Sequence, residues 1–119
     1  MGVVTMTYFA PLGKFVMSVG TAHSYPNMTG PFDTYFLESD ALTGPWRSIT
    51  YLEDFGPQAY FVNMPSKFLA ADVGPDGATY GGFLSYSANF AFPNKTASDP
   101  PGSGYHWSLQ QVRFTLREE

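Results

Sequence analysis

The sequence predicts an all-β protein, and three observations support this fold class. Glycine and proline are abundant, with 12 and 10 among 119 residues, and both interrupt helices and mark turns. Aromatic residues make up 18% of the chain and charged residues only 13%, a balance that favours strands over amphipathic helices. Segments rich in valine, threonine, tyrosine and phenylalanine alternate with turn-forming stretches, whereas helical periodicity is hard to find.

The first half of the chain predicts four strands joined in a meander. Residues 3–10 have a strand composition and end at Pro11-Leu12-Gly13, a turn-forming stretch that leads into the next strand. A second turn signal, Leu42-Thr43-Gly44-Pro45, precedes the fourth strand. The four strands are expected at residues 3–10, 14–19, 34–39 and 46–52, with a polar stretch at 20–31.

The second half repeats this plan with three strands. Gly74-Pro75-Asp76-Gly77 supplies the turn signal of a second hairpin. In the last strand, Val112 and Phe114 alternate with Arg113 and Thr115, so one of its faces is expected to be buried. These strands are expected at residues 60–70, 79–87 and 105–116, with a long loop at 89–104.

Repeated antiparallel meanders of this length are typical of propeller blades, which bury their faces only against neighbouring blades. The sequence therefore predicts two antiparallel β-propeller-like blades, at residues 1–55 and 56–119, that together form one structural unit. Two blades leave two flanks uncovered. The alternative is a single seven-stranded sandwich or open barrel, which a chain of this length also can form.

Composition and charge exclude several classes of function. The chain has ten acidic and six basic residues, a net charge of -4 and no basic cluster, so nucleic acid and membrane surfaces are not expected partners. It has no cysteine, which excludes disulfides and a cysteine nucleophile. No glycine-rich phosphate loop or serine-hydrolase elbow is found, so no cofactor is predicted. The chain start lacks the pattern of a signal peptide.

Two segments carry a resemblance to a known family. The stretch from Leu37 through Ser39-Asp40 to Gly44-Pro45-Trp46 resembles a turn in the outer hairpin of five-bladed β-propeller glycosidases of the arabinanase and xylosidase type. Residues 55–68, which include Pro65-Ser66-Lys67, together with residues 83–90, resemble the final blades of related secreted propeller proteins. The resemblance implies a carboxy-terminal fragment of such a propeller, an extracellular location and carbohydrate as the partner.

The same resemblance implies no catalytic residue in this chain. Glycosidases of that type place their three carboxylates on the innermost strands, mostly in earlier blades. The expected innermost strands here, residues 3–10 and 60–70, contain no aspartate or glutamate. The paired carboxylates that glycoside hydrolysis needs are therefore not expected on them.

Topology predicts a ligand face. In a meander the connections alternate between the two ends of the sheet, so the long segments 20–31, 53–59 and 87–104 gather at one end, where binding residues tend to lie. Aromatic rings there suit the apolar faces of sugars, and amides and carboxylates suit their hydroxyls. The expected binding residues are His23, Asp33, Tyr60, Asn63, Tyr86 and Asn89.

Alternatives stay open for several of these residues. Tyr60 and Tyr86 also suit a core position, and Glu53-Asp54 also suits a solvated connector. The two histidines, His23 and His106, match no metal-binding spacing, so no metal site is predicted. Asn27 and Asn94 begin N-glycosylation triplets.

Three functions follow from the sequence. The first is a glycan-binding, glycosidase-like propeller fragment that does not cleave the glycan alone. The second is a self-associating interaction module, a homo-oligomer that completes a propeller ring, because uncovered blade faces and edge strands favour association. The third is an active glycoside hydrolase that uses Asp33 or Glu53 and Asp54.

Overall fold

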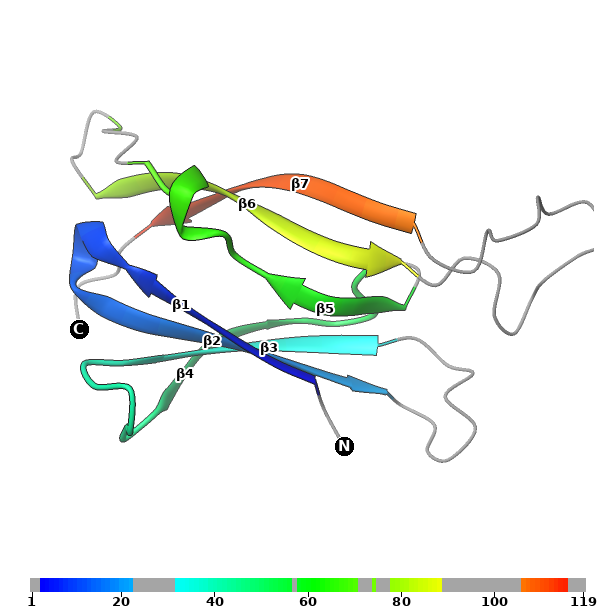
Figure 1. Ribbon diagram of the computed structural model, residues 1–119, viewed down its shortest axis with the longest axis horizontal. Coiled ribbons are helices and arrows are strands. Elements are labelled where there is room, and N and C mark those ends of the chain that lie inside the picture. The colour runs from blue at the N-terminus through cyan, green and yellow to red at the C-terminus, as the bar shows by residue number, and fades with distance from the viewer. Residues whose placement is uncertain are drawn as a thin grey trace, which may run out of the picture.

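The strands of the protein form two antiparallel sheets that face each other (Figure 1). The computed structural model describes residues 3–22, 32–56, 58–70, 74, 78–88 and 106–115. The first sheet has the order β1 (Val3–Phe9), β2 (Lys14–Ala22), β3 (Phe32–Ser39) and β4 (Arg47–Leu52). The second has the order β5 (Ala59–Asn63), β6 (Thr79–Ala88) and β7 (His106–Thr115). Two short 3-10 helices, η1 (Ala10–Leu12) and η2 (Ser66–Phe68), follow β1 and β5.

The prediction of an all-β meander is confirmed. Each sheet is built of consecutive strands, and every neighbouring pair is antiparallel. Within the described ranges no strand of one sheet pairs with a strand of the other, which disagrees with an open barrel. Two facing sheets of consecutive strands are the arrangement that both a pair of propeller-like blades and a seven-stranded sandwich require.

The first hairpin forms where the sequence predicts it. Proline occupies the first turn of η1, where its missing N–H costs nothing, and Gly13 ends that turn with a φ of 63°. The Gly13 N–H donates to the Ala10 carbonyl oxygen at 3.1 Å. Because glycine adopts this left-handed conformation without a steric penalty, the chain reverses sharply into β2.

The prediction of one continuous strand over residues 60–70 is wrong. β5 ends at Asn63, and the chain then turns through Pro65 into η2. Pro65 has no N–H with which to continue the ladder to β6, and its carbonyl oxygen instead accepts the Phe68 N–H at 3.0 Å. Pairing resumes only as the isolated bridge between Ala70 and Gly81.

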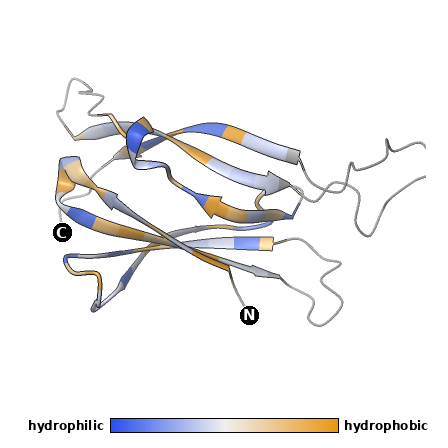
Figure 2. Ribbon diagram, in the orientation of Figure 1, coloured by the Kyte–Doolittle hydropathy of each residue, from blue (hydrophilic) through white to orange (hydrophobic). Residues whose placement is uncertain are grey.

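The core lies between the two sheets. Phe9, Val16 and Phe36 of the first sheet pack with Val62 and Leu84 of the second, together with Ala59 and Met64. The strands of both sheets carry hydrophobic stretches that alternate with polar positions (Figure 2). In β7 the side chains of Val112 and Phe114 are half-buried against this core, while Arg113 and Thr115 are exposed, so the predicted burial of one face is confirmed there.

A row of hydroxyl groups joins the sheets next to the core. Thr7 donates through Oγ1 to the Met64 carbonyl oxygen at 2.6 Å. The hydroxyls of Thr5 and Ser18 both reach the Val62 carbonyl oxygen, and they lie 2.6 Å from each other. β5 is therefore held on the first sheet by hydrogen bonds to its backbone as well as by apolar packing.

Candidate functional site

The connection between β4 and β5 lies at the predicted ligand end, and we call it and its neighbours the β4–β5 corner. It consists of residues 53–56 and 58–61 together with the first residues of β3 and with Tyr86 on β6. The Asp54 N–H donates to Oδ1 of Asp33 at 3.0 Å, and the Phe55 N–H donates to the Phe32 carbonyl oxygen at 2.8 Å. These bonds fasten the connection after β4 to the start of β3, so the corner has a fixed shape.

Left-handed backbone conformations follow one another through the corner. Asp54, Gly56 and Gln58 have φ values of 50°, 60° and 53°. Phe61, inside β5, has a φ of 52°. A left-handed backbone conformation is energetically unfavourable for a residue with a bulky side chain, and it persists only where the surrounding structure imposes it. Gly56 is the position where the sequence meets this requirement without cost.

Close ring packing explains why Gly56 must be glycine. A Cβ atom there would lie 3.1 Å from Cε2 of Tyr86 and 3.3 Å from Cβ of Ala59. The Tyr86 ring in turn packs on Phe55, with 4.9 Å between the ring centroids. The connection therefore packs closely on β6, and Phe55 and Gly56 both contact the Tyr86 ring.

A β-bulge turns Phe61 outward. Tyr60 pairs with Ser87 and Asn63 with Ser85, so β5 has one more residue than β6 between these two pairs. The Phe61 side chain is 54% exposed, and its ring meets that of Tyr60 edge-on with 4.5 Å between the centroids. Tyr60 also contacts the ring of Phe32, at 6.4 Å. The corner therefore presents one exposed ring that is supported by a second, half-buried one.

The corner also holds polar side chains. Asp33 is 8% exposed and Gln58 is 7% exposed, so both are buried. Glu53 and Asp54 are exposed beside them. A buried carboxylate that accepts a backbone N–H is well placed to hold the loop. The described residues contain no group of three or more histidine, aspartate or glutamate side chains arranged to hold a metal ion.

The sequence-predicted binding residues are only partly brought together. Asp33, Tyr60 and Tyr86 all belong to the β4–β5 corner. Asn63 lies at the other end of β5, where its Oδ1 is 3.5 Å from the Thr7 hydroxyl of β1. The remaining calls, His23 and Asn89 for binding and Asn27 and Asn94 for glycosylation, lie outside the described residues.

Phe61 is the residue that sequence reasoning missed. Strict alternation along residues 60–70 places Tyr60 and Phe61 on opposite faces and gives no reason to favour the second ring. The bulge that exposes Phe61 depends on pairing with β6, a strand that begins well beyond it in the chain. Two adjacent aromatic residues at the start of a strand are the only local signal.

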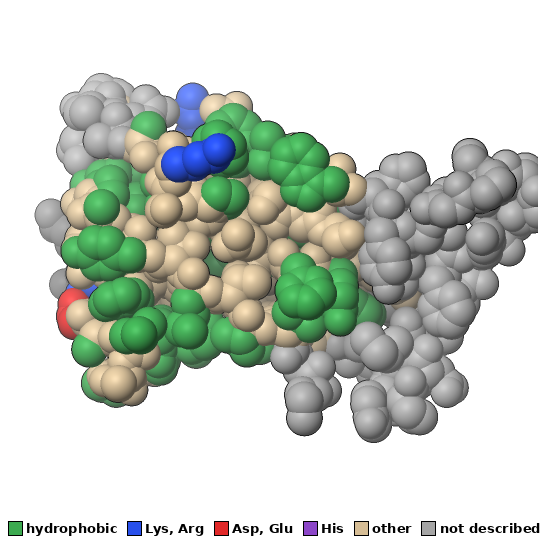
Figure 3. All heavy atoms as spheres, in the orientation of Figure 1, with side chains coloured by type: hydrophobic (Ala, Val, Ile, Leu, Met, Phe, Trp, Pro, Cys, Tyr) green, Lys and Arg blue, Asp and Glu red, His purple; other side chains and the backbone are tan. Residues whose placement is uncertain are grey.

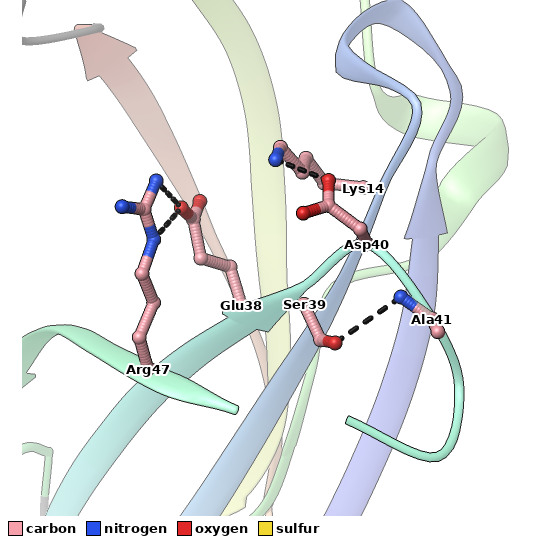
Figure 4. A network of polar contacts seen from close by, with 6 residues as sticks. All are labelled: Lys14, Glu38, Ser39, Asp40, Ala41 and Arg47. Carbon is pink, nitrogen blue, oxygen red and sulfur yellow. Dashed lines mark hydrogen bonds and ion pairs between the residues drawn. The ribbon is translucent and has the colours of Figure 1, made fainter. Parts of the chain in front are cut away.

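The opposite end of the first sheet carries two ion pairs (Figure 4). Lys14 of β2 binds Asp40, and Nε of Arg47 donates to Oε1 of Glu38 at 2.6 Å. The hydrogen bond and the positive charge from Lys14 lower the pKa of the Asp40 carboxyl below its ordinary value of 3.8. Both Asp40 and Arg47 are largely exposed, so these pairs mark the rim of the sheet.

Comparisons of the chain with protein-family models, with curated proteins and with solved structures find no match in any of the three. Among the described residues, no helix is long and apolar enough to cross a membrane.

Proposed function

We propose that this protein is a carbohydrate-binding, propeller-like fragment whose site is the β4–β5 corner. The observation that carries the proposal is the Phe61 ring, exposed on a bulge and backed by Tyr60. A left-handed backbone at a phenylalanine costs free energy, and strain of this kind clusters where a side chain is aimed at a ligand.

The chemistry of the corner favours a neutral sugar. A flat exposed ring covers the C–H face of a pyranose or furanose, and the exposed carboxylate oxygens of Glu53 and Asp54 can accept hydrogen bonds from its hydroxyls. Glu53 and Asp54 are exposed at the same corner, and the whole chain carries a net charge of -4. Repulsion from these charges disfavours uronic acids and sulfated glycans.

The propeller interpretation is part of this proposal. It is supported by sheets of consecutive antiparallel strands stacked in two layers, and by connections that alternate between the two ends. The resemblance of Gly44-Pro45-Trp46 to the glycosidase turn points in the same direction. Under this proposal the protein works outside the cell, where neutral glycans are found.

Binding without cleavage fits the corner better than hydrolysis does. Asp33, the most buried acid of the corner, accepts the Asp54 N–H and so holds the loop in place. Glu53 and Asp54 are exposed sequence neighbours rather than carboxylates that face each other across a sugar. An active hydrolase that uses these residues is therefore the less favoured proposal.

Calorimetric titration with neutral oligosaccharides tests the proposal through Phe61→Gly. Glycine accepts the left-handed backbone, so this variant is expected to keep the fold while it loses the ring. Loss of the contact between the Phe61 ring and the sugar is expected to weaken binding by about tenfold, since covering a phenylalanine side chain contributes about 1.5 kcal/mol.

Phe68→Ala is the matched control, because Phe68 is also an exposed ring, at 38%, but lies on η2 outside the corner. It is expected to bind like the wild type. A wild type that binds no neutral oligosaccharide at millimolar concentration contradicts the function. A Phe61→Gly variant that binds as the wild type does contradicts the site.

A further inference from the structure

Gly20 lies inside β2, and the described part of the chain gives no structural reason for a glycine there. Its backbone is not left-handed, unlike those of Gly13 and Gly56. It pairs in regular register with Val3 of β1 and with Thr34 of β3. Its two chain neighbours aside, a Cβ atom at Gly20 would meet no heavy atom of the described residues within 4 Å. A glycine inside a strand that serves neither a bulge nor close packing is typical of a place where a ligand approaches the backbone.

The open space beside Gly20, which we call the Gly20 gap, lies on the inner face of the first sheet. Alternation along β2 puts Gly20 on the same side as Val16 and Ser18, which are both buried. Gly20 itself is only half-buried, so solvent reaches this position. The gap therefore lies where the space between the two sheets opens to the outside.

A buried hydroxyl group without a partner adjoins the gap. Thr34 faces Gly20 across the β2–β3 pair and is fully buried. Among the described residues, nothing forms a hydrogen bond with its Oγ1. Paired residues on antiparallel strands carry their Cβ atoms on one face, about 4.5 to 5.5 Å apart. A hydroxyl one bond beyond the missing Cβ of Gly20 therefore comes within hydrogen-bond reach of the Thr34 hydroxyl.

The aromatic pair of the β4–β5 corner lies next to the Gly20 gap. The inner-face positions on the two sides of the gap are each fixed to β5. On one side, Ser18 donates to the Val62 carbonyl oxygen. On the other side, the Phe32 ring contacts the Tyr60 ring at 6.4 Å. Phe61 is the residue between Tyr60 and Val62, so it lies along β5 beside the gap.

The surface around this point is suited to a neutral ligand. β1 and β5 lie at the front of the view in Figures 1 and 3, and where they meet the space-filling view shows hydrophobic side chains and uncharged atoms (Figure 3). Val3, Thr34 and Tyr60 are likewise uncharged. A ligand that carries hydroxyl groups on an apolar ring matches this surface.

We propose that the Gly20 gap receives the exocyclic hydroxymethyl group of a hexopyranose whose ring lies on Phe61. The inference rests on the proposed carbohydrate binding at the corner and assigns its specificity. The carbon of the hydroxymethyl group takes the place of the missing Cβ, and its hydroxyl bonds Oγ1 of Thr34. A pentopyranose has the same ring without this group, so it leaves the gap unfilled and the Thr34 hydroxyl without a partner.

Both features of the gap destabilise the free chain. A glycine inside a strand loses more backbone entropy on folding than other residues do, and a buried hydroxyl without a hydrogen bond loses its hydration. Local choices that oppose stability are expected at functional sites, where the ligand supplies the missing contacts. A purely apolar group in the gap leaves the hydroxyl unbonded, so the arrangement favours a group that combines one carbon with one hydroxyl.

NMR titration of the full chain with two matched pairs of methyl glycosides tests the proposal. Methyl β-D-glucopyranoside and methyl β-D-xylopyranoside differ only in the hydroxymethyl group, and so do methyl β-D-galactopyranoside and methyl α-L-arabinopyranoside. In at least one pair the hexoside is expected to bind about tenfold more tightly than the pentoside, since it adds one buried carbon and one hydrogen bond.

Two variants assign this preference to the gap. Gly20→Ala fills the gap with a methyl group that meets no neighbour, so it is expected to melt no lower than the wild type. It is expected to bind the hexoside as weakly as the pentoside, with pentoside binding unchanged. Thr34→Val removes only the hydroxyl and is expected to reduce the preference about threefold. Thr7→Val is the matched control, because it removes a hydroxyl of the same face away from the gap, and it is expected to keep the full preference.

The results separate this inference from the function on which it rests. If no glycoside of either pair binds, carbohydrate binding at the corner is wrong, and the inference is wrong with it. If the glycosides bind and hexosides show no advantage in either pair, the function stands and the proposed role of the gap is wrong. A hexoside preference that survives in Gly20→Ala places the hydroxymethyl group elsewhere and also overturns the proposal.

Discussion

The two faces of the β1–β4 sheet differ in how their polar and apolar residues are used. The inner face combines core residues such as Phe36 with the hydroxyls of Thr5, Thr7 and Ser18, which bond the backbone of β5. The outer face carries a nearly continuous layer of valine, methionine and tyrosine. The inner face thus specifies where β5 lies, whereas Val4, Met6 and Tyr8 of the outer face remain exposed.

This difference shows that the two faces contribute unequally to stability. Hydrogen bonds from side-chain hydroxyls to backbone carbonyls have defined directions, so they fix one position of the second sheet. Apolar stabilisation scales with the area removed from water, so the exposed side chains of the outer face contribute less. Substitutions on the inner face are therefore expected to change stability more than those on the outer face.

The largest expected effect comes from adjacent residues on opposite faces of β3. Phe36→Ala removes a ring that is 5% exposed in the core, and it is expected to lower the free energy of unfolding by about 3 to 4 kcal/mol. Tyr35→Ala, one residue earlier and 38% exposed, is expected to cost about 1 kcal/mol or less. Urea unfolding of both variants at a concentration where the chain is single measures the difference. Equal losses would contradict the assignment of the two faces.

A smaller effect, with opposite signs, is expected for two inner-face threonines. Thr7→Val keeps the shape but removes the donor to the Met64 carbonyl oxygen, so it is expected to lower the free energy of unfolding by about 1 to 2 kcal/mol. Thr34 is fully buried, and its hydroxyl has no hydrogen-bond partner among the described residues. Thr34→Val is therefore expected to raise that free energy by about 1 kcal/mol.

Urea titrations of these two variants measure how much each hydroxyl contributes to the free energy of unfolding. If the urea midpoint of Thr7→Val equals that of the wild type, the hydrogen bond from Thr7 to the Met64 carbonyl oxygen does not stabilise the fold. If Thr34→Val is less stable than the wild type, its hydroxyl has a partner in solution, such as a buried water molecule.

Strand existence was predictable from sequence because it depends on local composition and turn residues. Gly13 and the Leu42 to Pro45 turn mark the first meander, and the alternation in residues 112–115 marks the buried side of β7. Local rules are also sufficient for the number of strands in each sheet. The end of β5 at Asn63 was missed, although Pro65 lies just beyond it.

Positions that depend on tertiary contacts were not predictable. Asp33 was expected in a binding site, and its burial arises from a bond to the Asp54 N–H, which forms only once β3 and the corner meet. The exposure of Phe61 arises from unequal pairing between β5 and β6. The inward direction of Thr5 is likewise fixed by the Val62 carbonyl oxygen, far along the chain.

The smallest expected effect concerns the charged rim of the first sheet. Because Lys14 lowers the pKa of Asp40 below 3.8, the ion pair stabilises the fold fully above pH 3.8. Its contribution is lost as the pH falls through the lower pKa of the folded state. Asp40→Asn has no carboxyl to titrate, so the difference in melting temperature between the wild type and this variant is expected to shrink between pH 5 and pH 2.

Lys14→Met is the companion variant, because it removes the cation and leaves Asp40 in place. The melting temperature of this variant is expected to change with pH as that of Asp40→Asn does. Since both charges lie at the rim, neither variant is expected to change the urea difference between Phe36→Ala and Tyr35→Ala. If acid lowers the melting temperatures of the wild type and Asp40→Asn equally, the pair contributes nothing to folding, and the apolar outer face and the hydroxyl row remain the features that distinguish the two sides of the sheet.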